Sequence, residues 1–96
     1  MHDERLGVGV VGCGIFGEIH AASYAEFEEA DLVAVCDLDG ARAARVAAAY
    51  GCRACTDLAQ IASDPSIRAV SVVTPDFAHH EICVALAKAG DRKSVV

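Results

Sequence analysis

The sequence lacks the features that mark membrane proteins and nonspecific nucleic-acid binders. No apolar run approaches the ~18 residues of a membrane-spanning helix. Basic residues are scarce, because 8 Lys and Arg stand against 14 Asp and Glu, and the formal net charge is -6. An acidic chain is not expected to bind nucleic acid or an anionic membrane surface without specificity. It can still bind a phosphate group through backbone N–H groups at the start of a helix.

An export signal is also missing from the first residues. Residues 1–5 are charged but mostly not basic, and the apolar segment behind them is interrupted by glycines. This pattern is not typical of a signal peptide, and we therefore expect a cytoplasmic protein. The 5 cysteines are an odd number, which in such a protein indicates reduced thiols rather than a disulfide framework.

Cys52 and Cys55 have the spacing of a redox or zinc pair, but no second pair of ligands accompanies them. Both lie in a segment that suits a short strand, where residues three apart point to opposite faces. We therefore expect small buried side chains at these positions and no metal site.

The apolar residues, 54% of the chain, are concentrated in short runs. Four runs are typical of buried strands: residues 6–11, 32–36, 52–56 and 69–73. Each run is followed by a segment that suits a helix: residues 16–27, 41–50, 58–62 and about 77–89. This alternation predicts an α/β fold, a partial doubly wound parallel sheet with right-handed crossovers. In the expected spatial order, 3-2-1-4, the fourth strand is an unpaired apolar edge, and such edges invite aggregation.

Several residues predict how the helices begin, end and face the sheet. Asp39 and Asp57 suit the N-caps of the second and third helices, and Gly51 suits the left-handed position after the second. In the first helix, four residues at helical spacing are expected to face the sheet: Ile19, Ala22, Ala25 and Phe27.

A glycine loop separates the first strand from the first helix; its residues are Gly12, Cys13, Gly14, Ile15, Phe16 and Gly17. In a dinucleotide-binding loop of this spacing, the first glycine permits the turn and the second lets a pyrophosphate approach the backbone. The third lets the helix pack against the strand. The motif alone is weak, and the alternative is a tight turn without a ligand. Here a strand precedes it, a helix follows, and Asp37 ends the second strand about twenty residues on, so the pattern predicts a Rossmann dinucleotide site.

Asp37 also bears on the choice of dinucleotide. Its carboxylate can accept hydrogen bonds from the ribose hydroxyls of the adenosine. A 2′-phosphate ~4 Å away would be repelled by ~4 kcal/mol per charge pair at an effective dielectric of ~20, before screening. NAD is therefore the expected cofactor, and NADP is disfavoured. Arg42 could pair with a phosphate, but a solvated charge on the helix is an equally good interpretation.

From residue 6 to residue 90 the chain resembles the Gfo/Idh/MocA family of oxidoreductases. Three segments carry the resemblance: the glycine loop with residues 18–21, the second strand through Tyr50-Gly51, and residues 74–79 with the helix ending at residue 90. The third is the most specific, because the family has Thr-Pro-Asn-x-x-His after its fourth strand. Asp76 replaces the usual Asn here. The resemblance implies that four residues line the cofactor cleft: Thr74, Pro75, Asp76 and His79.

The resemblance further implies an NAD(P)-dependent oxidoreductase that acts on the CH–OH group of a sugar, cyclitol or related small polyhydroxy substrate. The parent protein is expected to be a homo-oligomer. The family's catalytic lysine and substrate domain lie beyond the matched segment, so we assign no catalytic residue and expect residues 1–90 to be an incomplete NAD(P)-binding Rossmann domain without turnover of its own. Two alternatives stay open: a non-catalytic NAD-binding regulator and a different Rossmann dehydrogenase.

Residues 91–96, Asp-Arg-Lys-Ser-Val-Val, do not match the fifth strand that the family pattern would bring next. They can be encoded by DNA that resembles a common sequencing adapter, so one hypothesis is that this tail is an assembly artefact. With the fourth strand as an apolar edge, we expect the 96-residue chain alone to be marginally stable or to aggregate.

Overall fold

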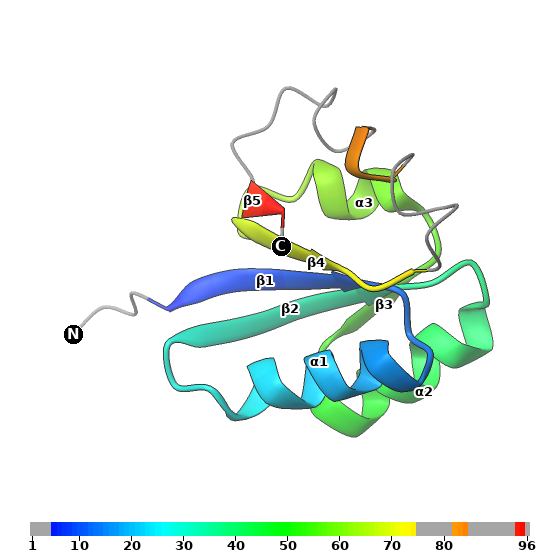
Figure 1. Cartoon of the computed structure of the whole chain (residues 1–96), viewed down its shortest axis with the longest axis horizontal. Helices are drawn as coiled ribbons and strands as arrows, with labels where there is room; N and C mark the ends of the chain where they lie inside the picture. Colours follow the sequence, from blue (N-terminus) through cyan, green and yellow to red (C-terminus); the bar gives the residue numbers. More distant parts are fainter. Residues whose placement is uncertain (1–4, 75–81, 85–93, 96) are drawn as a thin grey trace.

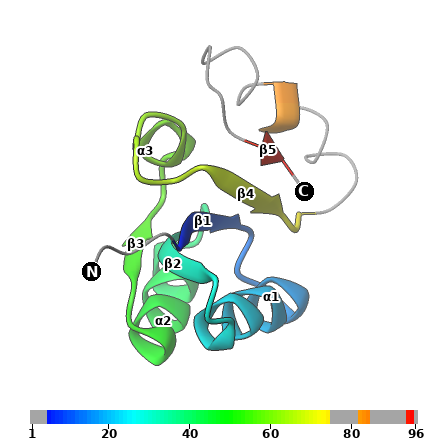
Figure 2. The ribbon, with the colours of Figure 1, turned by 90° about the vertical axis from the view of Figure 1, so that its left-hand side faces the viewer.

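The computed structural model describes residues 5–74, 82–84 and 94–95, and five parallel strands form one sheet in it. The sheet has the order β3-β2-β1-β4-β5 (Figures 1 and 2). Its strands are β1 (Leu6–Val11), β2 (Ala30–Cys36), β3 (Arg53–Cys55), β4 (Ala69–Val72) and β5 (Ser94–Val95). The helices are α1 (Ile15–Glu26), α2 (Gly40–Tyr50) and α3 (Leu58–Ala62), and residues 82–84 are also helical. The predicted α/β fold with alternating strands and helices is confirmed.

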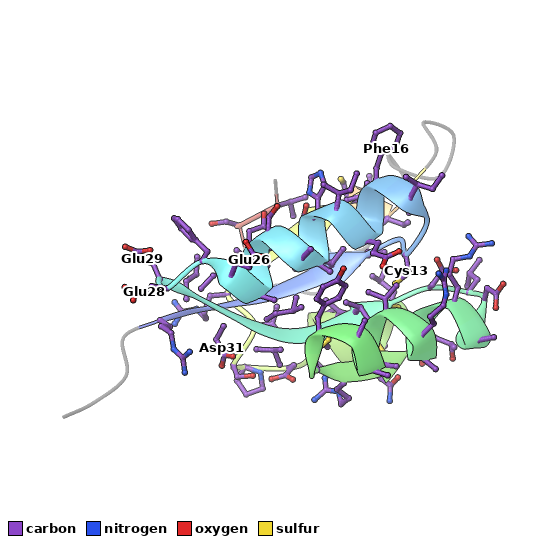
Figure 3. All side chains as sticks on the ribbon, turned by 90° about the horizontal axis from the view of Figure 1, so that it is seen from below. Cys13, Phe16, Glu26, Glu28, Glu29 and Asp31 are labelled. Atoms are coloured by element: carbon purple, nitrogen blue, oxygen red, sulfur yellow. The ribbon has the colours of Figure 1, made fainter. Side chains whose placement is uncertain are left out.

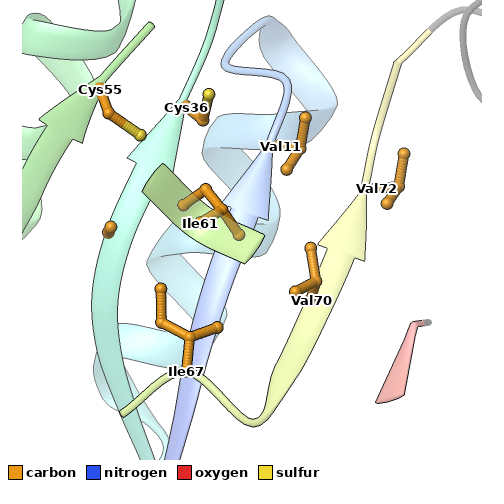
Figure 4. Packing of buried hydrophobic residues seen from close by; sticks show 8 residues of the cluster. Val11, Cys36, Cys55, Ile61, Ile67, Val70 and Val72 are labelled. Carbon is orange, nitrogen blue, oxygen red and sulfur yellow. The ribbon is translucent and has the colours of Figure 1, made fainter. Parts of the chain in front are cut away.

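Figure 2 shows the layers: α1 and α2 cover one face of the sheet, and α3 covers the other. Because both faces are covered, the strands are apolar on both sides rather than alternating. On the α3 face, Ile61 and Ile67 pack with Val11, Val70 and Val72 (Figure 4), and residues 82–83 pack against the same cluster. On the α1 and α2 face the core is formed by a second set that includes Val10, Leu32, Val35 and Val46. No helix in the described ranges is long and apolar enough to cross a membrane.

The ends of the helices follow the predicted capping. The Asp39 carboxylate accepts hydrogen bonds from the backbone N–H groups of Ala41 and Arg42, at 3.1 and 3.2 Å. The Asp57 carboxylate accepts one from Ala59 N–H at 3.0 Å. Gly51 ends α2 at φ 71°, in the left-handed region.

The predicted orientation of α1 is wrong. The side chains of Ile19 and Phe27 are 53% and 59% exposed, and Gly17 and Ala21 are the buried residues of the helix. Ala25 is also exposed, and Ala22 is half-buried. At Gly17 the helix lies so close to the β1 turn that a Cβ would collide with the carbonyl oxygen of Gly12, and Ala21 is buried one turn further on. Of the larger side chains of the helix, Tyr24 packs partly buried against the core, whereas Ile19 stays outside.

The fourth strand is not the edge of the sheet, as the sequence led us to expect. β5 pairs with β4 in parallel, with Ala69 opposite Ser94 and Val70 opposite Val95. The N–H of Ser94 donates to the carbonyl of Arg68 at 2.9 Å. An unpaired strand edge presents backbone donors and acceptors that any extended segment can satisfy, and residues 94–95 do so here.

Candidate functional site

A cavity of about 620 Å³ lies where the carboxyl ends of the central strands meet the following loops. Residues after β1, β2, β3 and β4 line it, together with residues from α2, α3 and the helical segment 82–84. From β1 the chain runs outward to β2 and β3 and then returns to place β4 on the other side of β1, so this is the point at which the strand order reverses. Open α/β sheets bind their ligands at such a point.

The glycine loop makes the turn at the floor of this cavity. Gly12 has φ 103°, and a Cβ there would collide with the carbonyl oxygen of Val73. A Cβ on Gly17 would collide with the carbonyl oxygen of Gly12. Gly17 is buried and does not line the cavity, so its place in the motif is to let α1 pack against the turn.

Gly14 differs from the other two glycines of the motif because nothing lies within 4 Å of the position that a Cβ would occupy. It is the N-cap of α1, and no side chain caps this helix, in contrast to α2 and α3. The first turn of a helix has N–H groups without intrahelical partners and carries a partial positive charge. The open space at Gly14 and the uncapped helix together form a cradle that fits an anion such as a pyrophosphate.

Asp37 is fixed at the end of β2 by the loops beside it. Its Oδ2 accepts a hydrogen bond from Cys13 N–H at 2.8 Å, and its Oδ1 accepts one from Asp39 N–H at 2.8 Å. The side chain is only 13% exposed and lines the cavity. Because each carboxylate oxygen has two lone-pair sites, both oxygens can accept a further hydrogen bond from a ligand. The bond to Cys13 joins the carboxylate to the glycine loop, which sequence spacing alone does not reveal.

Thr74, after β4, brings a polar group to the opposite wall. Its Oγ1 is buried and has no hydrogen-bond partner among the residues that the structure describes. A buried hydroxyl without a hydrogen-bond partner lowers the stability of the fold, and a hydrogen bond to a ligand oxygen would offset that penalty. Pro75, Asp76 and His79, which were predicted with Thr74 as cleft residues, lie outside the described residues.

The remaining residues of the glycine loop contribute backbone rather than side chains. Ile15 and Phe16 are 79% and 71% exposed and do not line the cavity, and Figure 3 shows Phe16 at the N-terminal end of α1. The Cys13 side chain is buried, and its Sγ lies 3.7 Å from the carbonyl oxygen of Cys36. Burial, and secondarily the charge of Asp37, raise the pKa of this thiol to about 11, so it is not a nucleophile at neutral pH.

Several lining residues escaped the sequence analysis: Leu38, Thr56, Leu58, Val73 and Ile82. Thr56 and Val73 are the last residues of predicted strands, and Leu38 and Leu58 lie two residues beyond one, which is a signal that could have found them. Arg42, for which two interpretations stood open, also lines the cavity. In the described part of the chain, no group of three or more His, Cys, Asp or Glu side chains is placed to hold a metal ion.

The sequence matches the model of a protein family described as "Oxidoreductase family, NAD-binding Rossmann fold" (Gfo/Idh/MocA), over residues 6–96. Among curated relatives, an inositol 2-dehydrogenase of Rhizobium meliloti strain 1021 is 39% identical over 83 residues, which are 85% of this chain and 24% of the relative.

Two solved structures share the fold closely. The structure of GenD2 from gentamicin A biosynthesis, in complex with NAD, has a TM-score of 0.89 and 35% identity over 99% of this chain and 27% of that chain. The structure of a myo-inositol dehydrogenase from Lactobacillus casei, in complex with NAD(H) and myo-inositol, has a TM-score of 0.87 and 26% identity over 95% and 27% of the two chains. The present chain spans about a quarter of the length of these relatives.

Proposed function

The chain belongs to the Gfo/Idh/MocA family of oxidoreductases, and on that premise we propose that its cavity binds the adenosine and pyrophosphate half of NAD. The observation that carries the proposal is the convergence of three groups in one cavity: the open cradle at Gly14, the Asp37 carboxylate and the unpartnered Thr74 hydroxyl. In this proposal, residues 1–90 are an incomplete NAD-binding domain of a longer protein.

Each of these groups suits one part of the cofactor. The N–H groups at the start of α1 would hold the pyrophosphate, which can approach because Gly14 has no side chain. Asp37 would accept hydrogen bonds from the adenosine ribose hydroxyls. Thr74 Oγ1 would donate to a cofactor oxygen. Pro75 and Asp76, which follow Thr74 in the motif, are proposed together with His79 from the family pattern to line the same cleft.

The position of Asp37 supports NAD over NADP. A 2′-phosphate would have to lie beside a carboxylate that is 13% exposed, where solvent screens charge poorly. The unphosphorylated ribose of NAD instead offers hydroxyl donors to the same oxygens.

For the whole protein, we propose an NAD-dependent oxidoreductase acting on the CH–OH group of a sugar, cyclitol or related polyhydroxy compound. The inositol dehydrogenases among its relatives support this substrate class. Bound NAD would supply the hydride acceptor, and the residues of this chain would bind and orient it. A cytoplasmic location and a homo-oligomeric parent are part of the same proposal.

Calorimetric titration of the 96-residue chain with NAD tests the proposal, with Gly14→Asp as the matched variant. Aspartate is a good N-cap, and nothing occupies its space, so the variant should melt at the same or a slightly higher temperature. Its carboxylate would occupy the pyrophosphate cradle, and we expect NAD affinity to fall more than tenfold. A folded wild-type chain that gives no binding heat, or a variant that binds as tightly as the wild type, would contradict the proposal.

A further inference from the structure

The guanidinium of Arg42 lies between two carboxylates at the rim of the cavity. Its Nη1 is 3.8 Å from Asp37 Oδ2, and its Nη2 is 3.7 Å from Asp39 Oδ2. Both distances are longer than a hydrogen bond, so charge attraction rather than a directional bond holds the guanidinium. Arg42 and Asp37 line the cavity, whereas Asp39 is not among its lining residues.

Asp39 is held in place by the backbone on both sides of it. Its Oδ1 accepts the two capping hydrogen bonds at the start of α2, and its own N–H donates to Asp37 Oδ1. The cap leaves Oδ2 as the oxygen that attracts Arg42. The three residues therefore form one unit, in which Asp39 fixes where the guanidinium can go without itself reaching the ligand.

We propose that Asp39 is a positioning residue that sets the cofactor preference by holding Arg42 against the two carboxylates and away from a 2′-phosphate. This inference rests on the proposed NAD site and extends it. Among these three side chains, one guanidinium against two carboxylates leaves one net negative charge, which repels a 2′-phosphate but does not repel an uncharged ribose hydroxyl. An arginine near this position in a Rossmann site can otherwise accommodate the 2′-phosphate of NADP.

Two substitutions change this preference in opposite directions. Asp39→Asn keeps an N-cap side chain but removes the charge that retains Arg42, so the ratio Kd(NADP)/Kd(NAD) should fall about tenfold. Arg42→Gln removes the cation that lies against both carboxylates, so the same ratio should rise by about the same factor. Calorimetric titration of the 96-residue chain with NAD and with NADP gives both constants, and a thermal melt confirms that each variant is folded.

A double-mutant cycle tests whether Asp39 acts on the cofactor preference through Arg42 or only through its own negative charge. In the Arg42→Gln background, Asp39→Asn should change the ratio less than half as much, on a logarithmic scale, as it does in the wild type. Asp57→Asn is the matched control, because Asp57 caps α3 in the same way and its substitution removes the same charge without touching Arg42. The control should leave the ratio within about twofold of the wild type.

Each outcome of these titrations decides one of the two claims. An unchanged ratio in Asp39→Asn, an effect of equal size with and without Arg42, or an equal shift in Asp57→Asn would overturn the role of Asp39 while leaving NAD binding intact. A folded wild-type chain that binds neither nucleotide would overturn the proposed function itself. If Asp39→Asn does not fold, Asp39→Ser, which retains a capping oxygen, takes its place in the same cycle.

Discussion

Thr74 is a residue at which stability and binding are expected to oppose each other. In the unbound chain its buried Oγ1 has no partner in the described part of the structure, and a buried unsatisfied hydroxyl costs about 1 kcal/mol or more. Thr74→Val keeps the shape and removes the hydroxyl. We expect the free energy of unfolding to rise by about 1 kcal/mol, while NAD affinity falls about tenfold because a hydrogen bond to a cofactor oxygen is lost.

Urea denaturation and calorimetric titration measure the two effects on the same sample. Thr56→Val is the control, because Thr56 also lines the cavity but is exposed, so its hydroxyl is satisfied by water in the unbound chain. If Thr74→Val destabilises the chain, the hydroxyl has a partner in solution and its assignment to the cofactor fails.

The buried thiols of Cys13 and Cys36 predict a loss of stability at high pH. Burial raises the pKa of Cys13 to about 11 and that of Cys36 to about 12, from an ordinary value of 9.0. Because the folded-state values are the higher ones, the folded chain retains protons that the unfolded chain releases. The stabilisation is complete below pH 9 and is lost as the pH rises from 9 toward 12.

We therefore expect the free energy of unfolding to fall steadily above pH 9, and less steeply in Cys36→Ala, which removes one of the two thiols. At pH 8 the native Cys13 thiol should react with iodoacetamide at least about a hundredfold more slowly than the unfolded one, because its thiolate fraction is that much smaller. Mass spectrometry of the alkylated peptides measures this rate, and equal rates in the native and unfolded chains would contradict the burial of Cys13.

At the scale of elements, two glycines at the junction of β1 and α1 have different roles: Gly17 permits packing, and Gly14 leaves space for a ligand. A Cβ on Gly17 would collide with the carbonyl oxygen of Gly12, whereas nothing lies within 4 Å of a Cβ on Gly14. Gly17→Ser should therefore push the helix away from the turn and lower the free energy of unfolding by about 1–3 kcal/mol. Gly14→Ser introduces the same side chain at an N-cap and should change it by less than about 0.5 kcal/mol or stabilise slightly. Urea denaturation measures the free energy of unfolding of both variants. Equal destabilisation would contradict the different roles of Gly17 and Gly14.

Helix α1 shows that a hydrophobic sequence pattern does not by itself predict which face of a helix is buried. The apolar residues of α1 recur at helical spacing, yet Ile15, Phe16 and Ile19 are exposed, because beside the β1 turn the helix lies too close for a side chain at Gly17. A hydrophobic pattern identifies a helix, but the interhelical and helix–sheet distances decide which face is buried. At α2 the capping signals succeeded, because Asp39 is the N-cap and Gly51 adopts the left-handed conformation after the helix, as predicted.

At the scale of the whole molecule, the sequence predicted most strands and helices but only part of the cavity lining. The apolar runs predicted β1 and α3 with their observed bounds, since both are short segments enclosed by strong turn residues. β5 was not predicted, because two residues carry no period and their pairing depends on an edge that only the assembled sheet creates. The cavity likewise combines Asp37, found from its spacing, with Leu58 and Ile82, which only the crossovers bring there.

The edge of the sheet and the charge of the chain together predict when the molecule associates with itself. Among the described residues, β5 pairs with β4 at Ala69 and Val70, and removing residues 94–96 would expose the backbone donors and acceptors there. At pH 8 the negative charge of the chain opposes association, whereas near the sequence pI of about 5.0 it does not. We expect the full chain to scatter light most strongly near pH 5, and a chain ending at residue 93 to form oligomers at pH 8 where the full chain does not. Size-exclusion chromatography with light scattering, repeated over a concentration series, measures both. If the two chains associate alike at pH 8, the pairing of β5 with β4 does not protect the edge in solution.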